Sequence, residues 1–237
     1  MTSTSAPDVE HRGRSGAHVY WTLRAKILDL QLPPDAKINI DALVRELGVS
    51  QTPIREALSQ LEGDRLIVKT PGKGYRTTAL LETAELRELF EFRLLIEPWA
   101  ARAAAVNRLS NPARILHASL DEFEAGASTD GSIRHQLVAH DTTFHDRILL
   151  ASSNEFALHA YRATHCHLHL FRLHPADYQG TSTVEEHRAI VDAIALCDPD
   201  AAESAMNRHL IGAYHRFAEA FSQEDSELRV PPPAKLC

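Results

Sequence analysis

Three histidines and one aspartate occupy positions where the C-terminal part of the chain should bury apolar side chains. Asp141 and His145 are one helical turn apart on the stripe that runs from Ile133 to Ile148. His187 and His209 lie on the apolar faces of two later helical stretches. Imidazoles and a carboxylate suit a borderline divalent ion, and binding one would offset the cost of their burial. A lone histidine on an apolar face is more often a core residue, so the residues alone support both interpretations equally.

An arginine also interrupts an apolar stripe. Arg93 shares a helix face with Leu89, Phe90 and Ile96. It could form an ion pair with Glu97, one turn later. It could instead line a ligand cavity, where its planar fork would bind a carboxylate with two hydrogen bonds.

The densest histidine cluster is His165, Cys166, His167 and His169. On a helix, His165 and His169 share a face while His167 points elsewhere, and only a strand would align all three. No strand pattern is present, so we predict a histidine-rich helix wall. One member could line a cavity and set its pH response. None is named as a metal ligand.

The segment 39–61, NIDALVRELGVSQTPIREALSQL, has the pattern of two short helices joined by a tight turn. Gly48 stands where a left-handed cap is needed, Ser50 is a candidate N-cap, and Pro53 falls in the first turn of the second helix. That helix has one apolar stripe, made by Ile54, Ala57, Leu58 and Leu61.

The opposite face of this second helix carries Gln51, Thr52 and Arg55. Short hydrogen-bonding and cationic groups at the exposed start of a helix are suited to reading the major groove of DNA. An ordinary helical hairpin with a polar outer face would look similar, so the flanking segments decide between the two.

Those flanks predict a winged helix-turn-helix domain over residues 17–79. An amphipathic helix marked by Val19, Leu23, Ile27 and Leu30 precedes it and stops before Pro33-Pro34. Two β-prone runs follow around the tip Pro71-Gly72-Lys73-Gly74, which is a hairpin signal. Gly72 allows close backbone approach to DNA, and Lys73 can meet a phosphate or enter the minor groove.

The rest of the chain is predicted to be helical, so the fold class is mainly α: a winged domain followed by an all-α bundle over residues 83–222. Thr83, Ser182 (with Glu185 as a capping box) and Asp198-Pro199 are candidate helix starts, and Pro98 should kink or interrupt the first helix. The predicted helices are 83–105, 111–126, 132–151, 154–173, 182–197 and 199–222. Residues 1–16 and 223–237 are predicted to be a disordered arm and tail.

Composition agrees with a cytoplasmic two-domain regulator. Among the 237 residues, the range 17–80 holds nine Lys or Arg against seven Asp or Glu, a net +2, whereas 81–237 carries −9. Charge distribution, rather than net charge, must therefore attract phosphates. Three scattered cysteines argue against a disulfide framework. No signal peptide or membrane-spanning run is recognised, so no membrane partner is expected.

The stretch from Leu32 to Thr78 resembles the DNA-binding domain of GntR-family transcription regulators, with VSQTPIREAL at the recognition-helix signature. The resemblance implies that Gln51, Thr52, Arg55 and Gly72 face DNA. The family most often has arginine in place of Gln51, and glutamine prefers adenine edges whereas arginine prefers guanine. Arg65 replaces a frequent glycine and could add a phosphate contact or simply be solvated.

Residues 83–221 resemble the FCD effector domain of the FadR-type subfamily. The matching segments are ELFEFRLLIEPWAARAAA, DTTFH, SSN, EEHRAIVDAI and AMNRHL, in family order. The resemblance implies a divalent metal ion on Asp141, His145, His187 and His209, zinc first and nickel or manganese as alternatives. It also implies a small carboxylate-bearing effector beside the metal, with Arg93 as its ligand.

We therefore predict a DNA-binding transcription regulator, a repressor of a metabolic operon, rather than an enzyme. It would bind a short palindromic double-stranded operator as a homodimer, because two-fold DNA sites demand two-fold proteins. Two alternatives use the same histidines and aspartate. One is a metal-responsive regulator, in which the ion is the signal. The other is a metal-dependent hydrolase, for which no dedicated base is identifiable and which leaves the winged domain unexplained.

Overall fold

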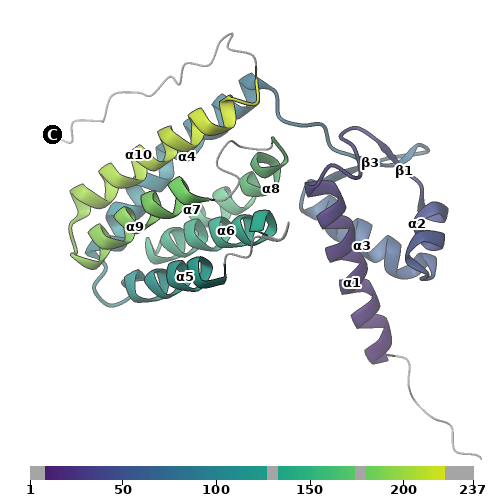
Figure 1. The fold of residues 1–237 in the computed structure, drawn as a ribbon, viewed down its shortest axis with the longest axis horizontal. Helices are drawn as coiled ribbons and strands as arrows, with labels where there is room; N and C mark the ends of the chain where they lie inside the picture. The colour runs from purple at the N-terminus through teal and green to yellow at the C-terminus, as the bar shows by residue number, and fades with distance from the viewer. Residues whose placement is uncertain (1–8, 127–132, 174–179, 222–237) are drawn as a thin grey trace, which may run out of the picture. The chain divides into compact units, whose positions relative to one another are not determined.

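The computed structural model describes residues 9–126, 133–173 and 180–221, with side chains from residue 16 onward. The chain divides into two compact units, Met1–Leu80 and Leu81–Cys237 (Figure 1). Each unit has its own apolar core, and each is described separately below. The predicted tail 223–237 lies outside the described residues.

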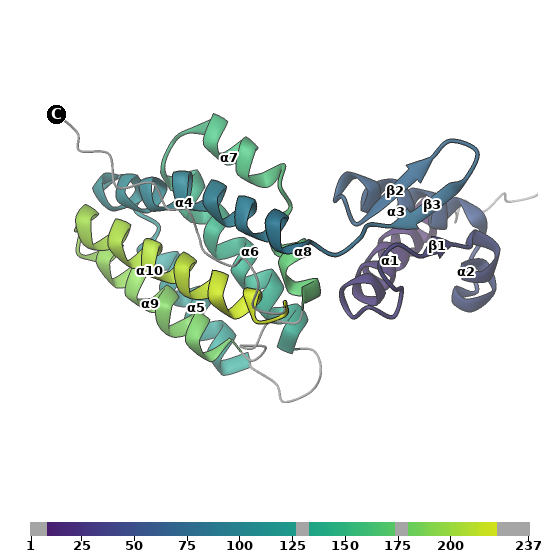
Figure 2. The same ribbon diagram turned by 90° about the horizontal axis from the view of Figure 1, so that it is seen from above.

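The N-terminal unit is the expected winged helix-turn-helix. Its elements are α1 (Val9–Leu28), β1 (Lys37–Ile38), α2 (Ile40–Leu47), α3 (Gln51–Gly63), β2 (Ile67–Thr70) and β3 (Gly74–Thr77). The strands form an antiparallel sheet in the order β1-β3-β2 (Figure 2). The core joins α1 to the apolar stripe of α3, because Val19, Leu23, Ile54 and Leu58 are all fully buried. Strand β1 was not predicted, since two residues carry no periodicity.

The turn between α2 and α3 has the predicted chemistry. Gly48 adopts the left-handed conformation (φ 66°), and its N–H donates to the carbonyl of Val44. Ser50 occupies the N-cap position of α3, although its side chain makes no capping hydrogen bond. This turn fixes the angle at which α3 leaves α2, and therefore which face of α3 remains in solvent.

Two predicted boundaries of the first helix were wrong. Helix α1 begins at Val9, so residues 9–16 of the predicted disordered arm 1–16 are helical, while residues 1–8 lie outside the described part. A polar extension of a helix that is already nucleated shows no apolar period, so the pattern could not reveal it. Leu30 lies beyond the end of α1 with φ 57°.

Arg65, where the family often has glycine, has a left-handed backbone with φ 58°. Its N–H donates to the carbonyl of Glu62, and the N–H of Leu66 donates to that of Leu61. A side chain costs about 1–2 kcal/mol in this conformation. The turn from α3 into the wing therefore explains why glycine suits this position.

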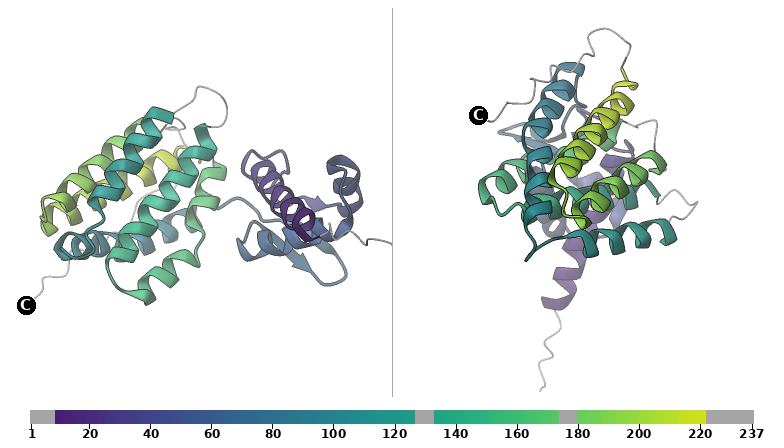
Figure 3. Two further views of the ribbon diagram at one scale, coloured as in Figure 1. Left: turned by 90° about the horizontal axis from the view of Figure 1, so that it is seen from below. Right: turned by 90° about the vertical axis from the view of Figure 1, so that its left-hand side faces the viewer.

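The C-terminal unit is an all-α bundle, as predicted. Its elements are α4 (Thr83–Val106), α5 (Ala113–Gly126), α6 (Ile133–Ala151), α7 (Glu155–Arg162), α8 (Cys166–Leu170), a 3₁₀ turn (Phe171–Leu173), α9 (Thr181–Ala195) and α10 (Pro199–Ala218). Helix α10 packs along both α4 and α9, α5 packs on α6 and α9, and α4 packs on α6 (Figures 1 and 3). Helix α4 continues through Pro98, where a kink or an interruption was predicted, so the helix is not interrupted; buried residues lie before the proline (Glu97) and after it (Ala100 and Ala101).

The helix starts in this unit agree only in part with those predicted from the sequence. Asp198 caps α10 by accepting from the Ala201 N–H, with Pro199 in the first turn, as predicted. Helix α4 is capped by Glu82 in a capping box with Glu85, one residue before the predicted cap Thr83. Helix α9 begins at Thr181 rather than after Ser182.

Gly180 is the reason for that earlier start. Its φ is 79°, and a Cβ there would lie 2.6 Å from Leu137 Cδ1 on α6. Only glycine allows this close approach of α9 to α6. The contact therefore helps to fix the position of α9 along α6, and with it the residues of α6 that His187 faces.

The single helix predicted over 154–173 was wrong. His165 has a left-handed backbone (φ 48°), which ends α7 and starts α8 in a new direction. As a result Cys166, His167 and Leu168 turn into the core, while His165 and His169 remain half-buried.

Candidate functional site

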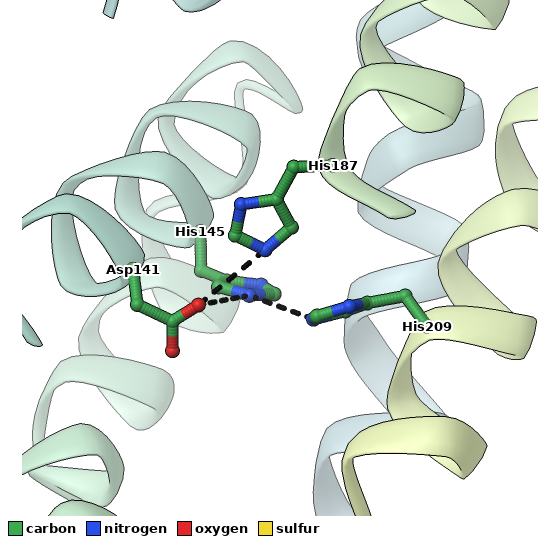
Figure 4. A group of neighbouring side chains, drawn as sticks. All are labelled: Asp141, His145, His187 and His209. Atoms are coloured by element: carbon green, nitrogen blue, oxygen red, sulfur yellow. Dashed lines mark hydrogen bonds and ion pairs between the residues drawn. The ribbon is translucent and has the colours of Figure 1, made fainter. Parts of the chain in front are cut away.

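Four buried side chains from three helices converge on one point of the bundle. Asp141 and His145 project from α6, His187 from α9 and His209 from α10 (Figure 4). One ligand atom from each residue lies within 4.8 Å of the others. Their exposed fractions are only 6%, 0%, 0% and 2%, respectively. All four residues singled out from the sequence are therefore together.

The spacing of the four side chains fits a bound metal ion. His145 Nε2 lies 3.2 Å from His209 Nε2 and 3.7 Å from Asp141 Oδ1, and His187 Nε2 lies 3.4 Å from the same oxygen. A tetrahedral ion with bonds of about 2.0–2.1 Å separates its ligand atoms by about 3.4 Å. Within the described part of the chain, His187 Nε2 is buried without a hydrogen bond. This Asp/His cluster could therefore hold a divalent ion.

Two glutamates hold the outer nitrogens of the histidines. Glu97 on α4 contacts His145 Nδ1, and Glu186 on α9 lies 2.8 Å from His209 Nδ1. A carboxylate at Nδ1 fixes a proton there and leaves Nε2 as the donor to a metal. Because both Nε2 atoms point inward, these contacts orient the rings toward the same centre.

His187 is oriented by neighbouring rings instead. Its imidazole stacks on Phe144 at a centroid distance of 3.7 Å with the planes nearly parallel. Its Nδ1 lies 3.4 Å from His140 Nε2. Phe144 and His140 both come from α6, so the helix that supplies two cluster residues also positions the third.

For three of the four cluster residues the electrostatics favour the protonation states that bind metals, whereas at His145 the carboxylates of Glu97 and Asp141 outweigh burial and raise the pKa. Burial and the neighbouring His209 lower the pKa of His187 well below its usual value, and burial also lowers the pKa of His209. Burial alone would raise the pKa of Asp141, but His167 and His145 outweigh it and hold that pKa well below its usual value. Neutral imidazoles and an ionised carboxylate are the forms that coordinate a cation.

Arg93 forms the ion pair with Glu97 that its sequence position allowed, and it also borders a small cavity. It is 1% exposed, its Nε donates to Glu97 Oε1 at 2.5 Å, and its Nη2 lies 3.4 Å from His145 Nε2. It also lines a small cavity together with Asp141 and His209. The arginine is therefore ion-paired and still beside the cluster.

This cavity has a volume of about 20 Å³, which is room for about one water molecule. Its other walls include Phe171, Phe217 and Arg216, whose guanidinium makes two hydrogen bonds to Glu186 at 2.8 and 2.7 Å. A group larger than water must therefore displace part of this lining in order to bind beside the cluster.

Glu186, His140 and Tyr161 were missed from the sequence, and His167 was noted there only as a member of the histidine cluster, with its side chain predicted to point elsewhere. The Nδ1 atom of His167 lies 2.5 Å from Asp141 Oδ2. Glu97 could be predicted as an ion-pair partner, because it lies one helical turn from Arg93. Glu186, His140 and Tyr161 had no such signal, because their contacts join different helices or depend on the break at His165.

In the N-terminal unit, the predicted DNA-contact residues are all exposed: Gln51, Thr52, Arg55, Gly72 and Lys73. Gln51 Nε2 donates to Asp41 Oδ1 at 3.0 Å, and Arg55 donates to Gln51 Oε1 at 3.3 Å. The wing tip turns at Gly72 (φ 72°), where the Lys73 N–H donates to the Thr70 carbonyl. The start of α3 and the tip of the wing are thus both available to a partner.

A winged helix-turn-helix followed by a helical domain with a buried Asp/His cluster defines a two-domain transcription regulator. Residues 16–76 match the family of bacterial regulatory proteins, gntR family, and residues 88–212 match the FCD domain. The chain belongs to the GntR family of transcription regulators and carries an FCD domain. In the described residues, no helix is long and apolar enough to cross a membrane.

Relatives agree with this assignment. A probable D-xylose utilization operon transcriptional repressor of Paenarthrobacter nicotinovorans is 31% identical over 78% of this chain and 80% of its own length. The HTH-type transcriptional repressor GlaR of Escherichia coli is 25% identical over 81% of this chain and 90% of its own. The structure of E. coli McbR/YncC has the same fold, with a TM-score of 0.67 at 17% identity, covering 88% of this chain and 99% of that one.

Proposed function

We propose that this regulator is a repressor of a metabolic operon, that it binds a palindromic operator as a homodimer, and that a small carboxylate-bearing effector releases it. The observation that carries the proposal is the buried cluster of Asp141, His145, His187 and His209 beside Arg93. Among the relatives, two are named as repressors, one of them of a sugar-utilization operon. The effector would act in the same domain that holds the cluster.

DNA recognition is assigned to the exposed start of α3 and to the wing. Arg55 and Gln51 would read base edges in the major groove, and Thr52 would support them. Lys73, at the wing tip, would contact phosphate. The Gln51 amide already bonds to Asp41 and Arg55, so the reading side chains support one another before DNA arrives.

Two substitutions separate these roles. Arg55→Ala should cost about 1–3 kcal/mol in operator binding and relax the preference at one base position. Lys73→Ala should weaken all sequences alike and lower the salt slope by roughly one unit. Both are measured by fluorescence anisotropy over a range of salt concentrations. Normal operator binding by Arg55→Ala would mean that α3 does not present this face to DNA.

The homodimer is assigned to the exposed face of α4. Leu95, Trp99 and Val106 follow one another at helical spacing on this face, with exposed fractions of 63%, 43% and 60%. Large apolar side chains that form a stripe on a helix in solvent are typical of an interaction surface. A second copy of this chain, meeting the same stripe across a two-fold axis, would bury it.

Trp99→Glu should therefore convert a dimer into a monomer in sedimentation at micromolar concentration, and operator affinity should fall with it. Leu196→Glu is the matched control, because Leu196 is 80% exposed outside this stripe and should leave the dimer intact. A wild-type monomer that binds a palindromic site tightly would contradict the dimer model.

The metal is proposed to be zinc, with nickel or manganese as alternatives, because three imidazoles and one carboxylate suit borderline ions. Asp141, His145, His187 and His209 would hold it, and the ion would offer an electrophilic centre to the effector. Arg93 lies next to His145 and lines the adjacent cavity. Its guanidinium would pair with the effector carboxylate, so the proposed effector is a small organic acid.

Effector binding would reach the winged domain through α4. This helix carries Arg93, begins at Thr83 and follows the end of the wing at Thr77. Because the cavity has room for only about one water, an acid must displace its lining and so favour a different position of α4 or α10. Typical coupling of about 1–3 kcal/mol would change operator affinity by roughly 5- to 150-fold. We expect weakening.

Arg93→Lys and His187→Ala separate the effector from the metal. Lysine keeps a cation beside Glu97, whereas alanine would leave that buried carboxylate with His145 as its remaining ion-pair partner. Arg93→Lys should retain metal but lose the response of operator binding to a panel of mono- and dicarboxylic acids. His187→Ala should lose both. Full metal occupancy and normal release in a His187/His209 double alanine variant would contradict the proposal.

The same experiment bears on the two alternative functions. In a metal-responsive regulator, adding metal alone would change operator affinity, and no acid would. A metal-dependent hydrolase would need a free base near the ion, yet Glu97 and Glu186 are each held by a histidine and an arginine. Because both carboxylates are already ion-paired, the site favours the regulator over the hydrolase.

A further inference from the structure

His167, in the histidine cluster 165–169, turns toward the Asp/His cluster and contacts Asp141. It is 3% exposed, and both of its ring nitrogens have close partners. Nδ1 lies 2.5 Å from Asp141 Oδ2, and Nε2 lies 2.6 Å from the hydroxyl of Tyr161. Tyr161 is itself 3% exposed. Tyr161, His167 and Asp141 therefore form a buried chain that ends on a cluster carboxylate.

The two oxygens of Asp141 face different partners. Oδ1 faces the cluster, 3.4 Å from His187 Nε2 and 3.7 Å from His145 Nε2. Oδ2 faces His167 instead. The imidazole of His167 thus faces Oδ2 with Nδ1 and the Tyr161 hydroxyl with Nε2, and the direction of the second hydrogen bond depends on the tautomer. The close approach of His167 therefore holds Oδ2 away from the centre that Oδ1 faces.

The backbone at His165 makes the contact possible. A continuous helix from α7 would point His167 away from the face shared by His165 and His169. The left-handed residue His165 restarts the chain as α8 and turns Cys166 and His167 inward. A side chain other than glycine is unfavourable in this conformation, and such outliers persist only where the surroundings require them.

We propose that His167, held by Tyr161, is a positioning residue that restricts Asp141 to binding the metal through Oδ1 alone. The proposal rests on the metal site of the proposed function. A carboxylate that binds through both oxygens occupies two coordination positions. One that binds through a single oxygen leaves a position for the carboxylate of an effector, on the side of the cavity that Asp141 and Arg93 both line.

The test uses the full chain, stripped of metal and titrated with Co²⁺ alone. Affinity is measured by competition with a chromophoric chelator, and the visible absorption of bound Co²⁺ reports its coordination number. His167→Ala should weaken Co²⁺ binding by about 10- to 100-fold. Its absorption should become less intense, because the released Oδ2 can enter the coordination sphere and raise the coordination number.

Two further variants separate the loss of the His167 contact from a general destabilisation of the fold. His167→Asn retains an N–H donor near the place of Nδ1 and should restore most of the wild-type spectrum. Tyr161→Phe removes only the hydroxyl and should shift the spectrum in the same direction as His167→Ala, to a smaller extent. His159→Ala, on α7 with a side chain 71% exposed, is the control and should match the wild type.

The outcomes distinguish the inference from the metal site itself. If the wild type does not bind Co²⁺, the metal site is wrong. If the wild type binds and both His167→Ala and Tyr161→Phe show wild-type affinity and absorption, the positioning role is overturned. Should His167→Ala fail to fold, as judged by circular dichroism of the metal-free protein, His167→Asn and Tyr161→Phe decide the result.

Discussion

The C-terminal domain depends on how it accommodates three imidazoles and a carboxylate that helix packing has taken out of water. Burying such groups without partners would cost several kcal/mol. The bundle supplies a layer of partners around them: Glu97 for His145, Glu186 for His209 and His167 for Asp141. His187 Nε2 is buried and aimed at the cluster without a hydrogen bond. A cation at the centre would satisfy it.

This requirement joins helices that are distant in sequence. Glu97 and its partner Arg93 come from α4, Glu186 from α9, and Arg216, which holds Glu186, from α10. These ion pairs link the centre to α4, which begins after the wing, and to α10, which packs along α4. The small cavity beside the cluster lies between these same elements, which is why the site and the proposed switch share residues.

Much of this arrangement could be predicted from local pattern. The stripe of α3 and the cap at Gly48 follow from helical spacing and backbone chemistry, and they locate the exposed face that carries Gln51, Thr52 and Arg55. Asp141, His145, His187 and His209 stand out because polar side chains interrupt apolar faces. In each of these cases the informative feature lies within one helix and its ends.

What could not be predicted depends on contacts between helices or on a single backbone angle. The left-handed conformation of His165 has no periodic signature, and the predicted continuous helix placed His167 on the wrong side. In the sequence, Glu186 looks like an ordinary solvated residue. Its contacts with His209 and Arg216 of α10 become apparent only in the folded structure. The start of α9 is set by the close approach of Gly180 to Leu137, a tertiary contact that overrides the Ser182 capping pattern.

The most direct test of the central claim is the metal content and thermal unfolding of the chain after purification, dialysis against zinc, and treatment with a strong chelator. We predict one ion per chain. Its removal should lower the unfolding temperature of the C-terminal domain, because an ion at about 100 times its dissociation constant stabilises by about 2.7 kcal/mol. The same treatment should not affect a variant that lacks both His187 and His209. A wild-type chain that binds neither zinc, nickel nor manganese, and whose unfolding ignores all three, would contradict the account.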